Sequence, residues 1–173
     1  IIFSDFNYGC LPQDLVKRII KLANKYNVMM TADSQSSSQF GNISRFKGMK
    51  LISPTEREAR IACRNNEDGL IGLTQKLREE SKATNIFIKL GSEGLLIDTL
   101  KNTQHVTDKI PKLNNFPIDI IGAGDALLAT SSLLLAAGAN IWESSLLGSI
   151  SAAIQVSKRG NIPIKNEEIV KNL

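Results

Sequence analysis

The feature that most constrains the fold is the alternation of short apolar runs with amphipathic segments along the 173 residues. The runs at 1–5, 28–33, 49–53 and 86–90 have the length and apolar character of parallel strands that are buried on both faces. Segments with apolar residues at helical spacing separate them. This order predicts an α/β fold in which helices cover both faces of a mostly parallel sheet.

The helices expected between these strands have recognisable starts. Pro12 opens the first, in which apolar residues recur at helical spacing through Ala23. The polar loop at 34–39 is expected to be mobile. The remaining expected elements are helices at 55–61, 70–81, 123–137 and 143–156, a short tail helix, and strands at 94–98 and 105–107. Because ligands of such sheets bind beyond the carboxyl ends of the strands, functional side chains are expected there.

Composition and charge limit the classes of partner. Hydrophobic residues make up 42% of the chain and charged residues 22%, the balance of one globular domain. The net charge of +4 suits an anionic ligand, but the basic residues are scattered and only 5% of residues are aromatic, so no nucleic-acid partner is expected. Cys10, Cys63 and the single histidine, His105, exclude a disulfide framework and a zinc site. A cytoplasmic setting is expected.

No membrane segment is predicted. The start at Ile1 has no basic region and does not resemble a secretory signal, and the absence of an initiator Met indicates a chain that begins inside a longer protein. Positions 126–142 form 17 uncharged residues, close to bilayer-spanning length. Polar residues at 130–132 interrupt this stretch and Gly138 reads as a helix stop, so a helix buried within a domain is the better interpretation.

The strongest indication of chemistry is the segment Asp119-Ile-Ile-Gly-Ala-Gly-Asp125 ahead of an apolar helix. Gly122 and Gly124 leave backbone N–H groups uncovered at the positive end of the helix dipole, where an anion can bind. Asp125, in the first turn, is well placed to take a proton from a hydroxyl that attacks a bound phosphorus. The structural alternative is a glycine turn with Asp125 as a stabilising first-turn acid.

A second glycine-bearing turn directly follows the buried strand at 86–90. In Lys89-Leu-Gly91-Ser-Glu-Gly94 the two glycines allow a tight turn where a nucleotide could approach the backbone. By itself this pattern fits a plain hairpin turn equally well.

Together the two segments resemble the PfkB/ribokinase family of carbohydrate kinases. Residues 119–125 are similar to the family's C-terminal signature DTxGAGD, and 89–94 to its upstream TLGxxG turn. The resemblance extends downstream and covers nearly the whole chain. Within the family, the segments 4–11 and 31–34 look most like the kinases that act on heptose 7-phosphate, the kinase half of ADP-heptose synthases.

The resemblance implies a ribokinase-like three-layer fold and ATP-dependent, Mg²⁺-assisted transfer of a phosphoryl group to a hydroxyl of a sugar or sugar phosphate. It makes Asp125 the catalytic base, and Glu58 falls on the Glu of the family's NxxE motif, which organises Mg²⁺ through water. The implied anion hole consists of Gly122, Ala123 and Gly124, and the implied nucleotide contacts are Lys89, Gly91, Gly94 and Ser149. The first candidates for sugar contact are Asp5, Asn7 and Asp33.

Several positions depart from the family pattern. Thr55 replaces the Asn of NxxE and, with Glu58, also has the spacing of a capping box. Ile120 replaces the Thr of the signature, while Tyr8 and Gln35 stand where the heptose kinases carry lysines. These departures keep open a non-catalytic nucleotide-binding or interaction module derived from a sugar kinase. A dinucleotide-binding oxidoreductase is disfavoured because no GxGxxG follows the first strand.

The length of the chain also departs from the family. Members of the family are considerably longer, and their sugar-binding lid lies in an N-terminal half for which this sequence has no match. We therefore interpret residues 1–173 as the C-terminal, nucleotide-binding portion of a PfkB-type kinase domain. The expected protein partner is the missing N-terminal half or further copies of the same chain, because an uncovered sheet edge favours association.

Overall fold

A computed structural model describes residues 1–35 and 41–172, and the chain divides into two compact units. The first unit contains Ile1–Lys89 and Leu96–Asp108, and the second contains Leu90–Leu95 and Lys109–Leu173. The polar loop expected at 34–39 lies, from residue 36 onwards, outside the described residues.

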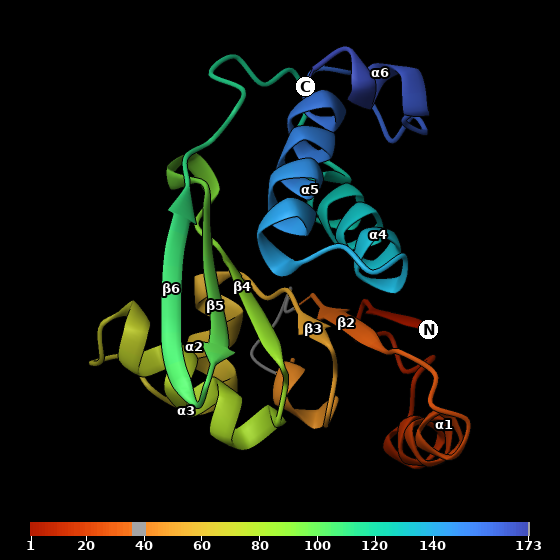
Figure 1. Ribbon diagram of the computed structural model, residues 1–173, viewed down its shortest axis with the longest axis vertical. Coiled ribbons are helices and arrows are strands. Elements are labelled where there is room, and N and C mark those ends of the chain that lie inside the picture. The colour runs from red at the N-terminus through yellow and green to blue at the C-terminus, as the bar shows by residue number, and fades with distance from the viewer. Residues whose placement is uncertain (36–40, 173) are drawn as a thin grey trace. The chain divides into compact units, whose positions relative to one another are not determined.

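Most of a six-stranded sheet, in the order β1-β2-β3-β4-β5-β6, lies in the first unit (Figure 1). Its first four strands pair in parallel, as predicted. The last two are joined by Asn102 and Thr103, whose φ angles of 50° and 67° suit a two-residue hairpin turn between antiparallel strands. The strands are β1 (Ile2–Asp5), β2 (Thr31–Ser34), β3 (Leu51–Ile52), β4 (Asn85–Lys89), β5 (Leu95–Lys101) and β6 (Gln104–Ile110).

Two strands are shorter than their apolar runs predict. β2 begins only at Thr31, after Val28, Met29 and Met30, and β3 keeps two of the five residues expected at 49–53. Met30 and Met49 are nevertheless buried. The apolar pattern therefore reports burial, which extends beyond the residues of the regular strands.

The helices of the first unit are α1 (Gln13–Lys25), the short 3₁₀ helix η1 (Ile43–Arg45), α2 (Glu56–Cys63) and α3 (Leu70–Ser81). α3 has the predicted bounds, and α2 starts as predicted because Thr55 caps it. On α1, Val16 and Ala23 are buried, but Leu22 is 57% exposed. The expected apolar face of α1 is therefore only partly buried.

A buried charge pair ties α3 to β5 in the first unit. The guanidinium of Arg78 bonds the carboxylate of Asp98 and also donates to the carbonyl oxygens of Ala83 and Thr84. His105 Nδ1 lies 3.4 Å from the other carboxylate oxygen of Asp98. The single histidine therefore lies beside a structural ion pair.

The second unit contains the 3₁₀ helix η2 (Gly91–Glu93), α4 (Ala123–Ala136), α5 (Ile141–Gln155) and α6 (Asn166–Val170). α4 and α5 pack side by side (Figure 1). Gly148 permits their close approach, because a Cβ there would lie 2.2 Å from Ser131 Oγ. The uncharged stretch at 126–142 is split between these helices, and no helix in the described residues is long and apolar enough to cross a membrane.

Candidate functional site

Two of the predicted sugar-contact residues lie at the carboxyl ends of neighbouring strands. Asp5 ends β1 and is in register with Ser34, while Asp33 of β2 is in register with Ser4. Each aspartate is only 5% exposed. This edge of a parallel sheet is where ligands bind, and buried carboxylates there need charged or hydrogen-bonding partners.

The partner of Asp33 is Lys89, at the end of β4. Lys89 Nζ lies 2.7 Å from Asp33 Oδ2, and the N–H of Ser34 donates to Asp33 Oδ1 at 2.9 Å. Burial raises the pKa of Asp33 above its ordinary value, and the ammonium of Lys89 opposes that rise only in part. Lys89, expected at the nucleotide, thus has its charge directed at the neighbouring carboxylate.

Asp5 is held by Arg45, a residue that the sequence analysis did not single out. Arg45 Nη2 lies 2.6 Å from Asp5 Oδ2 and donates to the carbonyl oxygen of Leu11 at 2.9 Å. The guanidinium also lies over the ring of Phe46, 4.6 Å from its centre. Because Arg45 and Asp5 are 40 positions apart, no local spacing could have indicated this pair.

Asn7 connects the ends of β1 and β2. Its N–H donates to Asp5 Oδ1 at 3.0 Å, and its side-chain amide donates to Ser34 Oγ at 3.2 Å and to the carbonyl oxygen of Gln35. Asn7 has a φ of 57°, a left-handed conformation that Asn tolerates well. The structure therefore brings together the three predicted sugar-contact residues Asp5, Asn7 and Asp33.

Glu58, the predicted Mg²⁺ residue, takes part in the capping box of α2. Thr55 N–H donates to Glu58 Oε2 at 2.7 Å, and Glu58 N–H donates to Thr55 Oγ1 at 3.2 Å. The same Thr55 forms an isolated bridge with Lys89. Glu58 is close enough to Asp33 for its charge to raise the pKa of that residue. In the described parts of the chain, no three acidic, histidine or cysteine side chains form a metal-binding group.

The residues predicted as anion hole and base begin α4 in the second unit. Gly122 is the N-cap, with a left-handed φ of 79° and no side chain to cap the helix. Among the described residues, the amides of Gly124 and Asp125 donate no hydrogen bond, and the amide of Ala123 has only a 3.4 Å contact to the carbonyl oxygen of Ile120. Free amides and the helix dipole together make this helix start suited to an anion.

Asp119 fastens the segment that leads into α4. Its Oδ1 accepts the N–H of Ile121 and its Oδ2 accepts the N–H of Gly160, both at 3.0 Å. These donors hold the pKa of Asp119 below its ordinary value. Gly122 packs behind this connection, since a Cβ there would meet Asn161 Oδ1 at 2.6 Å. The sequence pattern contained Asp119 but did not reveal this role.

The predicted nucleotide residues are distributed over both units. Lys89 belongs to the first, whereas Gly91, Gly94 and Ser149 belong to the second. Gly94 closes a tight turn in which Leu90 N–H donates to the Gly94 carbonyl at 2.9 Å, and a Cβ at Gly94 would lie 2.1 Å from the carbonyl oxygen of Ile110. Gly91 has open space around it, and Ser149 is half-buried on α5.

A sheet whose first four strands are parallel, with charged side chains at their carboxyl ends, and a helix that starts on a glycine pair with free amides are typical of the class of α/β proteins that bind phosphate groups. Residues 2–168 match the pfkB family carbohydrate kinase model. The chain belongs to that family, which confirms the resemblance drawn from 89–94 and 119–125.

Curated relatives carry the name bifunctional protein HldE. The chain is 27% identical to that of Methylobacillus flagellatus over 176 residues and 29% identical to that of Campylobacter fetus subsp. fetus over 164 residues. These alignments cover 100% and 93% of this chain but 34% of each relative. The chain thus spans about a third of the length of the curated relatives it matches.

Solved structures support the fold class. Phosphofructokinase-2 from Escherichia coli in complex with potassium superposes with a TM-score of 0.79 at 16% identity, over 98% of this chain and 54% of that one. Ribokinase from Thermotoga maritima gives a TM-score of 0.75 at 21% identity, over 98% and 55%. The fold is α/β and ribokinase-like, as the sequence predicted.

Proposed function

We propose that the protein to which this chain belongs transfers the γ-phosphoryl group of ATP to a hydroxyl of a sugar or sugar phosphate. The observation that carries the proposal is the start of α4, where Gly122 leaves the amides of Gly124 and Asp125 free beside the Asp125 carboxylate. Membership of the pfkB family supports it. In this role residues 1–173 are the C-terminal, nucleotide-binding portion of the kinase domain.

In the proposed reaction Asp125 takes the proton of the acceptor hydroxyl as its oxygen attacks the γ-phosphorus. The bond from that phosphorus to the bridging oxygen of ADP breaks, and ADP leaves. The amides of Gly122, Ala123 and Gly124 would receive the charge that develops on the transferring group. Most of the acceleration in such a transfer comes from positioning and fixed charge.

The nucleotide would lie along Gly91 and Gly94, with Ser149 near the base and Lys89 near the phosphates. Lys89 is engaged with Asp33 at 2.7 Å. An incoming phosphate would therefore have to compete with, or share, that ammonium. Such a double role would let the site hold a largely buried cation without leaving it unpaired.

Mg²⁺, when bound, would neutralise phosphate charge. The residues present fit such an ion: Glu58 and Asp33 are close enough to interact electrostatically, and Mg²⁺ usually takes one or two carboxylates together with water and substrate phosphates. Glu58 already accepts the Thr55 N–H through one oxygen. We therefore assign it to hold the ion through water.

The acceptor would lie near Asp5, Asn7 and Asp33, with heptose 7-phosphate as the candidate substrate. The resemblance of 4–11 and 31–34 and the relatives named bifunctional protein HldE support this choice. The setting that we propose from the family is the cytoplasm. The partner would be the upstream half of the kinase or another copy of the chain, and one relative of the fold, phosphofructokinase-2, has a tetrameric inhibited form.

The test uses the chain joined to its natural upstream sequence. We expect isothermal titration to show binding of ATP and ADP that strengthens with Mg²⁺, and a coupled assay to show ADP release that depends on one member of a panel of sugars and sugar phosphates. Absence of nucleotide binding would contradict the proposal.

A second candidate is a non-catalytic nucleotide-binding module. Two observations favour it: Lys89 is neutralised by Asp33, and Ile120, 75% exposed, stands where the family signature has a hydroxyl. Nucleotide binding without turnover on any acceptor in the panel would select this candidate.

A further inference from the structure

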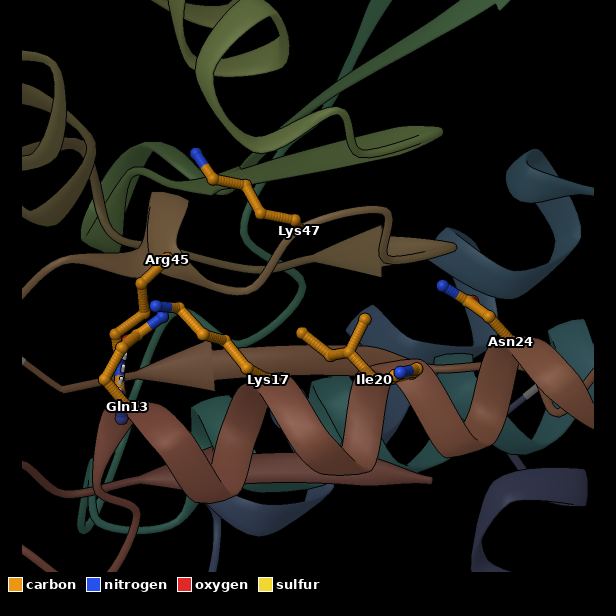
Figure 2. Close-up of a pocket in the computed structure, with 7 residues that line it drawn as sticks. Gln13, Lys17, Ile20, Asn24, Arg45 and Lys47 are labelled. Carbon is orange, nitrogen blue, oxygen red and sulfur yellow. Dashed lines mark hydrogen bonds between the residues drawn. The ribbon is translucent and has the colours of Figure 1, made fainter.

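A hollow of about 420 Å³ lies in the first unit, and Figure 2 draws the side chains that line it. It is formed by one face of α1 and by the residues at and after η1. Its volume falls in the range of sites that take small molecules, roughly 300–1,000 Å³. Its lining residues are Gln13, Lys17, Ile20, Lys21, Asn24, Arg45 and Lys47.

Four of the seven lining side chains are cationic, and none is acidic. Asp5 neutralises Arg45, which leaves the charges of Lys17, Lys21 and Lys47. Among the described residues, Lys17 and Lys21 form no ion pair or hydrogen bond, and Lys47 donates to the carbonyl oxygen of Glu80, which leaves its charge uncompensated. The hollow therefore carries a local excess of positive charge.

The arrangement along α1 gathers this charge on one face. Gln13, Lys17 and Lys21 follow one another at spacings of four, so they lie above one another on the helix. Two lysines at that spacing repel, which disfavours the helix by a few tenths of a kcal/mol unless an anion lies between them. Figure 2 shows Lys17 pointing towards Arg45, whose Nη1 donates to Gln13 Oε1 at 3.2 Å.

Donors suited to a phosphate are present at the same place. Arg45 is fixed in direction by Asp5 and by the carbonyl oxygen of Leu11, and the amide side chains of Gln13 and Asn24 can bond the hydroxyls of a polar body. A small anion bearing hydroxyls would satisfy the lysine charges and the exposed side-chain amides of Gln13 and Asn24.

We propose that this hollow binds a small phosphorylated metabolite, with its phosphate held by Lys17, Lys21 and Lys47 beside Arg45. None of its lining residues is among those proposed for catalysis, nucleotide binding or acceptor binding, and the inference does not depend on kinase activity. Arg45 nevertheless joins the hollow to Asp5 at the end of β1.

The test compares two double variants of the 173-residue chain. Lys17→Gln with Lys21→Gln removes two charges from the hollow, and Arg18→Gln with Lys25→Gln removes two charges from exposed positions of the same helix outside it. All four positions are exposed, and Gln is as good a helix former as Lys or Arg. Circular dichroism checks that both variants fold.

Binding is measured by isothermal titration with fructose 6-phosphate and, separately, with inorganic phosphate. We expect the first variant to lose at least tenfold in affinity for fructose 6-phosphate and the second to change by less than twofold. Tighter binding of fructose 6-phosphate than of inorganic phosphate would show that the sugar body contributes. Equal losses in both variants, or binding only to a polyanion such as single-stranded RNA, would mean a diffuse surface charge and would overturn the proposal.

Discussion

Asp125 has two possible roles at the start of α4, and a single exchange separates them. Asp125→Asn keeps the size of the side chain and removes the base. In the protein that includes the sugar-binding half, we expect kcat to fall by about 10²–10⁴-fold, the usual contribution of a positioned general base. Nucleotide affinity should stay within a few-fold or improve, because repulsion from the carboxylate is gone. Unchanged turnover in a coupled assay would make Asp125 only a stabilising first-turn acid.

The ion pair between Lys89 and Asp33 gives a prediction about stability. Lys89→Met leaves the buried carboxylate without its cation, at a cost of about 3 kcal/mol in the free energy of unfolding. Urea denaturation measures the loss, and Lys101→Met, at an exposed position of β5, is the control with no effect. An equally small change in the free energy of unfolding of both variants would show that the ion pair between Lys89 and Asp33 does not stabilise the fold.

The same variant should respond to pH in a defined direction. Burial already raises the pKa of Asp33 from 3.8, so the folded chain takes up a proton at a higher pH than the unfolded chain does. The contribution of Asp33 to the free energy of unfolding therefore increases as the pH falls through the interval between the folded-state and unfolded-state pKa values. Removing Lys89 raises the pKa of Asp33 further. The loss of unfolding free energy in Lys89→Met should therefore be largest near neutral pH and should shrink towards a pH of about 4.

Asp119 gives the opposite pH dependence. Hydrogen bonds from Ile121 and Gly160 lower its pKa from 3.8, so its contribution is present above that value and is lost as the pH falls through the lower pKa of the folded state. Asp119→Asn should therefore destabilise the chain near pH 7 and make little difference near a pH of about 2. Urea denaturation of the parent chain and of Asp119→Asn across this pH range checks the prediction. A difference in their free energies of unfolding that does not change with pH would contradict it.

At the scale of elements, the turn at Gly91 and Gly94 offers a matched pair. Both glycines have positive φ, 59° and 94°, but only Gly94 lies against backbone, where a Cβ would be 2.1 Å from the carbonyl oxygen of Ile110. Gly91→Ala should cost about 1 kcal/mol for its left-handed backbone. Gly94→Ala should cost more than that, because the backbone must move as well. Thermal denaturation compares the two variants. Equal losses of stability would contradict the close packing of Gly94 against the backbone of Ile110.

Elements whose ends are set by local chemistry could be predicted from the sequence. α2 begins where the Thr55 and Glu58 spacing indicates, and the start of α4 at Gly122 follows from the glycine pair ahead of an apolar run. Strand ends were harder to predict, since β3 is only Leu51–Ile52 although the apolar run around it is longer. The partners of Asp5 and Asp33 could not be predicted, because Arg45 and Lys89 reach them only once the order of the strands is known.

For the whole molecule, the lengths of the relatives decide how its activity should be tested. The chain covers 54% of phosphofructokinase-2 and 34% of the HldE relatives, although nearly all of the chain itself is matched. β1 has a neighbour on one side only in the described sheet, and Ile2 on it is 45% exposed. Such an edge can take up a further strand, from an upstream half or from another copy.

The last prediction therefore concerns residues 1–173 by themselves. Phosphoryl transfer needs an acceptor held in line and a site closed to water, and this chain contains the proposed anion site, base and nucleotide residues but no recognised sugar-binding lid. We expect the purified chain to bind adenine nucleotide weakly, seen as a rise in its melting temperature with ATP, and to release no ADP in response to any sugar. Robust sugar-dependent ADP release would show that the acceptor site is complete within the chain, and Asp5, Asn7 and Asp33 would be the first residues to exchange.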